Sequence, residues 1–215
     1  MLSKADDYPI HQSPEPIAYA GQSRNFYDRY FFNGYDIEGD VFFALGMGVY
    51  PHVDVIDAGF SLIRNGVQHD LLCSRALGME RMDTHVGNIQ VEVIEPLQSL
   101  RLRIDAPEHG IEADLLFSGR APAQEEPRFT RRLGSQLFLD YTRLTQNGHW
   151  EGWIKHQGER IEVAPLRWLG TRDRSWGIRP IGERDAQANP SAEPFQQFYW
   201  LWAPINWGNA VTLYH

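Results

Sequence analysis

Residues 170–180, GTRDRSWGIRP, hold the densest group of side chains that could do chemistry. The members of this signature are Arg172, Asp173, Ser175, Trp176, Gly177 and Arg179. A carboxylate beside guanidinium groups can form a bidentate ion pair, and an indole ring offers a face on which a cation can stack. Glycine beside the ring permits a close approach of backbone or a positive φ. The segment therefore predicts either an ion-pair site or an acid site.

Asp173 is the candidate catalytic residue, as a general acid. Hydration of an isolated double bond begins with protonation of carbon, and aromatic faces can stabilise the resulting cation. The acid must stay protonated until then, and the arginines on either side of Asp173 would lower its pKa. We therefore favour the alternative, in which Asp173 is structural and forms ion pairs where two domains meet, which we call the ion-pair latch.

Aromatic side chains are the candidates for ligand binding. Phe198, Trp200 and Trp202 recur at every second position of FQQFYWLWAPINW (195–207), and Trp176 and Tyr35 are further candidates. Residues two apart on a strand share one face, so the three could line an apolar cavity. Packing in the core of a second domain would produce the same pattern, and the sequence leaves both interpretations open.

Other side chains lack the pattern that a special site needs. Gly46 and Gly48 could suggest a phosphate loop, but no Lys-Ser/Thr follows them, and we expect a bend of a barrel strand there. Cys73 is the only cysteine, which excludes an internal disulfide and a cysteine-based zinc site. Asp57 shows no pattern of partners and is expected to be solvated. We expect neither a metal nor a cofactor.

The overall composition excludes several classes of partner. Twenty basic against 28 acidic residues give a net charge of −8, and no basic stripe is present, so we expect no nucleic-acid binding. No apolar run approaches the roughly 20 residues that a membrane span needs. The first residues lack the apolar core of a secretory signal, and we expect a cytoplasmic protein.

The elements that must position these residues are short strands joined by turns. In segments 100–105 and 111–119 apolar residues alternate with polar ones, which is typical of half-buried strands. Glu38-Gly39-Asp40, Asn65-Gly66 and Asn147-Gly148 each predict a hairpin turn. No window has a clear helical period. The pattern predicts an all-β protein whose antiparallel strands form a barrel or a sandwich.

The chain divides into four predicted parts. Residues 1–22 form a polar N-terminal arm, 23–181 a barrel domain, 182–194 a linker, and 195–215 the first strands of a second β domain. The sequence ends at VTLYH, which has the pattern of a strand and no polar tail after it, so we expect a fragment with a truncated second domain. The aromatic strand without its partners should then promote self-association.

The signature at 170–180 resembles the R-D-x-S-W-G-x-R pattern of a mostly uncharacterised bacterial group related to AttH and hydroxyneurosporene synthase (carotenoid 1,2-hydratase). The preceding NGHWEGWIKHQGERIEV and IEADLLFSG are similar to segments of that group, and the resemblance covers about 26–215. It implies an antiparallel lipocalin-like (calycin-like) barrel, the first of two such domains, with the signature near the crossing between them.

The same resemblance implies a lipophilic small-molecule partner, such as an isoprenoid, a polyene or a fatty-acid-like compound, in a barrel or inter-domain cavity. Two functions remain open: binding without catalysis, or a hydro-lyase or cyclase, since fungal lipocalin-like pericyclases share this architecture. A buried, arginine-free Asp or Glu in the cavity would favour the enzyme. A cavity lined only by apolar and aromatic groups would favour the binder.

Overall fold

Strands dominate the computed structural model, which describes residues 2–19, 21, 23–133, 136–181 and 200–214. Within these ranges the only helices are three short 3-10 helices, η1 (Lys4–Asp7), η2 (Ile17–Tyr19) and η3 (Pro107–His109). None of them is long and apolar enough to cross a membrane. The predicted all-β class is confirmed.

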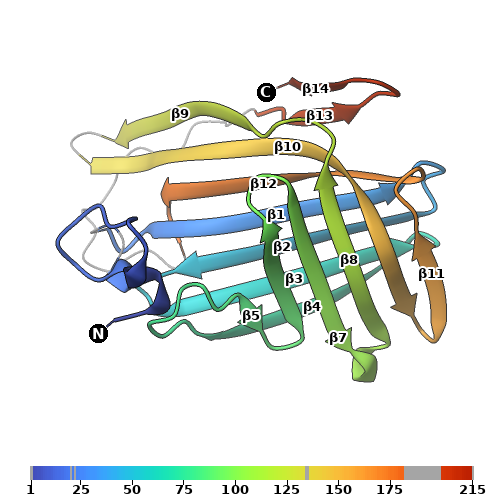
Figure 1. The fold of residues 1–215 in the computed structure, drawn as a ribbon, viewed down its shortest axis with the longest axis horizontal. Helices are drawn as coiled ribbons and strands as arrows, with labels where there is room; N and C mark the ends of the chain where they lie inside the picture. Colours follow the sequence, from blue (N-terminus) through green and yellow to red (C-terminus); the bar gives the residue numbers. More distant parts are fainter. Residues whose placement is uncertain (1, 20, 22, 134–135, 182–199, 215) are drawn as a thin grey trace.

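Twelve strands form one antiparallel sheet that curls into a nearly closed barrel (Figure 1). Its order is β4-β3-β2-β1-β12-β10-β8-β7-β6-β5, and β9 and β11 each pair with β10. The strands are β1 (Phe26–Asp36), β2 (Val41–Tyr50), β3 (Val55–Arg64), β4 (Val67–Ala76), β5 (His85–Val86), β6 (Ile89–Glu95), β7 (Ser99–Ala106), β8 (Ile111–Gly119), β9 (Gln124–Leu133), β10 (Gln136–His156), β11 (Glu159–Val163) and β12 (Trp168–Ile178).

A separate hairpin of β13 (Ala203–Asn206) and β14 (Val211–Tyr214) lies outside the barrel, against β10 and β12 (Figure 1). Arg120 holds its turn by donating to the carbonyl oxygens of Trp207 and Gly208, each at 2.9 Å. Residues 182–194, the predicted linker, fall outside the described ranges. The division into a barrel and a second domain remains a prediction.

The barrel interior is filled by apolar side chains, with Trp150 at its centre. The Trp150 ring packs edge-on against Phe43 and Phe117, and its Nε1 donates to the backbone oxygen of Asn33 at 2.9 Å. Leu102 on β7 and the inward residues of β8 are fully buried, as the alternation in the sequence predicted. Most of the interior is therefore a packed core.

Strand β10 runs through the Asn147-Gly148 pair, so the hairpin turn predicted there is wrong. Gly148 pairs with Gly170 of β12 on one side and with Gly119 of β8 on the other. A Cβ at Gly148 would lie 2.6 Å from the backbone oxygen of Ser118. Close packing of neighbouring strands, rather than a turn, is thus the reason for glycine here. The turns at 38–40 and 65–66 are confirmed, with positive φ at Gly39, Asn65 and Gly66.

The N-terminal segment covers one end of the barrel, where β1 begins and β2 and β12 end (Figure 1). Asp6 folds this segment on itself by accepting hydrogen bonds from the backbone nitrogens of Ser3 and Ile17. The backbone nitrogen of Lys4 donates to Glu80 at 2.9 Å, and Ala5 is buried. These contacts hold the arm against the barrel.

Candidate functional site

Strand β12 carries most of the signature, and the alternation of a strand sends its side chains to opposite faces of the sheet. Arg172 and Arg174 face the barrel interior, whereas Asp173 faces outward. Arg172 donates from Nε to Gln146 Oε1 at 2.8 Å, and Arg174 pairs with Asp28. The arginines that are adjacent to Asp173 in sequence are therefore not its partners in space.

Asp173 is a buried acid, 7% exposed, and its Oδ1 has no hydrogen-bond partner among the described residues. Burial raises the pKa of its carboxyl group, and the nearby Arg143 and Arg29 offset this only in part. The argument from sequence that neighbouring arginines lower the Asp173 pKa is wrong, because those arginines lie on the other face. A raised pKa favours the protonated form that a general acid needs.

Trp202, just before β13, contacts the residues on either side of Asp173 in the sheet. Phe31 and Thr145 flank Asp173 on the two adjacent strands. The Trp202 ring lies 6.2 Å from the Phe31 ring, and its Nε1 is 3.3 Å from Thr145 Oγ1 and from Glu126 Oε1. Trp202 thus packs against both of the residues that flank Asp173 in the sheet.

The rest of the signature on the outer face is tightly packed. Gly177 has a φ of 139°, and a Cβ there would lie 2.6 Å from the Cα of Tyr141 on β10. The predicted positive φ is thus confirmed, and the close contact is with the backbone of β10. Ser175 is buried and hydrogen-bonds the Tyr27 hydroxyl, while the Arg179 guanidinium lies 4.5 Å from the centre of the Tyr27 ring.

A groove of about 640 Å³ runs over the outer face of β1 to β4, and Phe31, which pairs with Asp173, lines it. Its floor consists of small residues at outward positions, where Gly46 of β2 pairs with Gly59 of β3. A Cβ at Gly46 would meet no heavy atom within 4 Å, and the Tyr50 ring lies over Gly48. Of the two β2 glycines, which were predicted to mark a strand bend, Gly46 therefore leaves the floor of this groove open, and Gly48 makes room for the Tyr50 ring.

Polar groups gather at one end of the groove, and the sequence had placed only Arg179 among them in a site. Asp57 on β3 is half-buried, and burial raises its pKa while a backbone hydrogen bond from Gly48 lowers it. Burial likewise raises the Tyr50 pKa, and Asp57 adds to this. Arg29 and Arg179 line the same end. The expectation that Asp57 is solvated is wrong, because it becomes buried only when β2 and β3 pair.

The remaining predicted ligand-binding residues are dispersed. Trp200 stacks on Trp202 at 6.4 Å with Arg143 4.9 Å from its ring centre, so these two lie beside Asp173. Tyr35 contacts the hairpin through Asn206 Nδ2, at 3.3 Å. Trp176 lies on the inner side of the sheet at the barrel end that the N-terminal segment covers, and its ring centre is 5.9 Å from Arg174. Phe198 lies outside the described residues.

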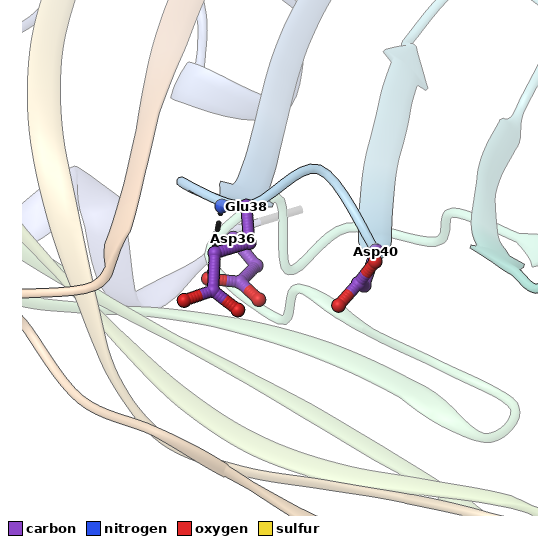
Figure 2. A group of neighbouring side chains, drawn as sticks. All are labelled: Asp36, Glu38 and Asp40. Atoms are coloured by element: carbon purple, nitrogen blue, oxygen red, sulfur yellow. Dashed lines mark hydrogen bonds between the residues drawn. The ribbon is translucent and has the colours of Figure 1, made fainter.

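An acidic cluster lies apart from this site, at the turn between β1 and β2 (Figure 2). Carboxylate oxygens of Asp36, Glu38 and Asp40 lie within 4.8 Å of one another. Arg167 Nη2 is 3.5 Å from Asp36 Oδ1 and 2.9 Å from Glu38 Oε2. Because an arginine already neutralises part of this cluster, we assign no metal to it.

Comparison with known proteins supports the fold. The model of a family of unknown function, DUF8625, matches residues 2–215. No curated protein matches the sequence. Kievitone hydratase from Nectria haematococca shares 13% identity over 69% of this chain and 47% of its own, with a TM-score of 0.52.

Two structures of CghA, without and with Sch210972, share 14% and 13% identity, with TM-scores of 0.46 and 0.47. Each match covers 72% of this chain and 46% of CghA. The chain thus spans about half the length of these solved structures. The likeness to kievitone hydratase agrees with the lipocalin-like barrel predicted from the sequence.

Proposed function

The chain belongs to the DUF8625 family, whose function is unknown, and we propose that its outer groove binds a lipophilic small molecule. The observation that carries this proposal is the hollow between Gly46 and Gly59, beside the aromatic rings of Phe31 and Tyr50. Glycine in a strand costs stability, and nothing packs against Gly46 that would require it. An open, aromatic-sided space of about 640 Å³ is the size of a small-molecule site.

The ligand class follows from the walls of the groove. Phe31, Ala44 and Leu72 supply apolar surface, and the polar groups gather at the Asp57 end. An isoprenoid, a polyene or a fatty-acid-like compound has this division into an apolar body and a single polar end. The resemblance of the signature to the AttH and hydroxyneurosporene synthase group points to the same class.

We also propose that the protein is cytoplasmic, because a protein with a single cysteine, Cys73, forms no internal disulfide.

A neutral apolar fluorophore, N-phenyl-1-naphthylamine, tests the groove. Gly46→Leu should fill the hollow and abolish saturable probe binding, with unchanged or raised stability because leucine suits a strand better than glycine. Glu151→Leu, an exposed position on β10 outside the groove, is the control for added apolar surface. Probe binding that Gly46→Leu leaves intact would refute this location.

The second candidate is a hydratase or cyclase, and Asp173 is the observation that favours it. A buried carboxyl with a raised pKa can protonate an alkene carbon, after which water adds to the cation and returns a proton to the carboxylate. Arg143 is near enough to oppose this, so the acid is not arginine-free. The name of the structural neighbour kievitone hydratase fits this class of reaction.

Incubation with geranylgeraniol in H₂¹⁸O separates the two candidates. An enzyme should form a hydrated product that carries ¹⁸O, and Asp173→Asn should abolish it. A pure binder should return the alcohol unchanged, while still displacing the naphthylamine probe.

A further inference from the structure

A second cavity lies on the inner face of the sheet, at the barrel end where the N-terminal arm lies. It has a volume of about 450 Å³ and is independent of the outer groove. Asp28, Tyr30 and Arg174 line it from β1 and β12, together with Val49, which is paired with Asp28 on β2, and Val91 of β6. Its wall thus carries both charged and apolar side chains.

Two guanidinium groups share one carboxylate in this cavity. Arg174 pairs with Asp28, and Arg81 Nη2 lies 3.4 Å from Asp28 Oδ2. Arg174 also lies 4.3 Å from the centre of the Tyr30 ring. The Nε of Arg81 is buried and has no hydrogen-bond partner in the described part of the chain. These three charged groups leave one positive charge without a counter-ion.

The other carboxylates at the cavity do not supply that counter-ion. Glu92 pairs with Arg103 at 3.1 Å, and Asp83 pairs with Arg75 at 3.0 Å. Each of these acids therefore has an arginine of its own. The excess positive charge stays with Arg81 and Arg174, although burial lowers the pKa of Arg174 to about 10, which leaves it protonated at neutral pH.

The N-terminal arm forms part of the cavity wall. Ala5, Ile10 and Ile17 contribute to its lining, and Arg81 Nη1 donates to the backbone oxygen of Ile17 at 3.1 Å. The arm thus adds apolar surface and is held by one of the two arginines. A molecule in this cavity would be enclosed between the arm and the barrel.

We propose that this cavity binds a small amphipathic monoanion, with its carboxylate between Arg81 and Arg174 and its aliphatic part along the apolar wall. Arginine binds carboxylates through paired N–H groups, and the unpartnered Nε of Arg81 is one such donor. The bound carboxylate supplies the missing counter-ion. The volume lies in the usual range for small-molecule sites.

Calorimetric titration with octanoate and 1-octanol tests the proposal. Octanoate should bind saturably with one site per chain, and 1-octanol at least tenfold more weakly, because only the anion balances the charge. Arg81→Gln should weaken octanoate at least tenfold while the fold is retained, since Asp28 keeps Arg174. Arg101→Gln, which loses a surface pair with Asp114, is the matched control and should leave affinity unchanged.

Asp28→Asn should act in the opposite direction, because it removes the carboxylate that competes with the ligand. Octanoate should bind this variant more tightly than wild type and raise its melting temperature by more, even where the substitution lowers stability. Equal affinity for octanol and octanoate, or full affinity in Arg81→Gln, would overturn the proposal. Loss of octanoate binding in Gly46→Leu would overturn it too, since that places the anion in the outer groove.

Discussion

Replacing Asp173 with asparagine should leave the protein as stable as wild type, or more stable, at neutral pH. The Asp173 carboxyl is 7% exposed, its Oδ1 has no partner among the described residues, and burial raises its pKa. Ionisation of this group therefore opposes folding, by about 1.4 kcal/mol for each pKa unit between the folded and unfolded states. Asparagine has nearly the same shape and no charge, so we expect a gain of about 0.5–2 kcal/mol.

The pH dependence of stability is an independent test of whether Asp173→Asn stabilises or destabilises the protein. A carboxyl whose pKa is raised in the fold contributes stability that is complete below its unfolded value of about 4 and is lost as the pH rises through the folded value. The difference between Asp173→Asn and wild type should be near zero at pH 4 and largest at pH 7.5. Urea denaturation at several pH values measures it.

Asp140, on the adjacent strand β10, is the matched control with the opposite sign. Its oxygens accept hydrogen bonds from Arg128 at 2.6 and 2.5 Å and from Thr130 at 3.0 Å, and the Arg128 bonds are the main reason that its pKa is lowered. This stabilisation is present above the unfolded pKa and is lost as the pH falls below about 4. Asp140→Asn should thus destabilise the protein at pH 7 and cost little at pH 3.

A substitution of Trp202 tests whether burial of the carboxyl is the cause of the stability gain in Asp173→Asn. If Trp202 shields Asp173, then Asp173→Asn in a Trp202→Ala background should give little or no gain, because water then reaches the carboxylate. If Asp173→Asn instead lowers the free energy of unfolding by about 1–3 kcal/mol at pH 7, the size expected for a broken charge-assisted hydrogen bond, Asp173 is a structural ion-pair residue and this prediction is refuted.

Further predictions concern the frame around the sites. Gly177→Ala should destabilise by about 1–3 kcal/mol in a thermal melt, because its φ of 139° strains any other residue. Trp150→Ala should cost about 3–5 kcal/mol in urea denaturation, since it empties the centre of the core. The pKa of Asp6 is lowered to about 2, mainly by the hydrogen bond from the Ser3 backbone nitrogen, so the ionised Asp6 should hold the N-terminal arm in place at neutral pH. Proteolysis within residues 2–19 should therefore accelerate as the pH falls from about 4 toward 2. Sedimentation velocity at rising concentration should detect self-association through the exposed Trp207 and Tyr214, and Trp207→Ser should reduce it.

The sequence alone was enough for the fold class and for much of the local geometry. Alternation along 100–105 and 111–119 identified strands, because a strand repeats every two residues whatever surrounds it. The turns at 38–40 and 65–66 followed from residues that tolerate positive φ. Gly177 belonged to the same class of local signal. Each of these features depends on near neighbours in the chain.

Only the tertiary structure decided where the charges lie. Asp173 stands next to two arginines in sequence, yet β12 turns them to the opposite face, where Arg174 meets Asp28 and Arg172 meets Gln146. The alternation could have signalled this separation if residues 168–178 had been recognised as a strand. The burial that raises the Asp173 pKa could not have been predicted, because it depends on which distant segments pack around β12, such as Trp202 against the neighbouring Thr145.

The turn at Asn147-Gly148 and the outer groove required the tertiary structure for the same reason. Two neighbouring strands pair with β10 across that position, and their ladders override the local preference for a turn. The groove exists because pairing aligns Gly46 with Gly59, and Asp57 is buried by the strand beside it. The sequence determined which residues could occupy strands and turns, whereas the register between distant strands determined which of them share an environment.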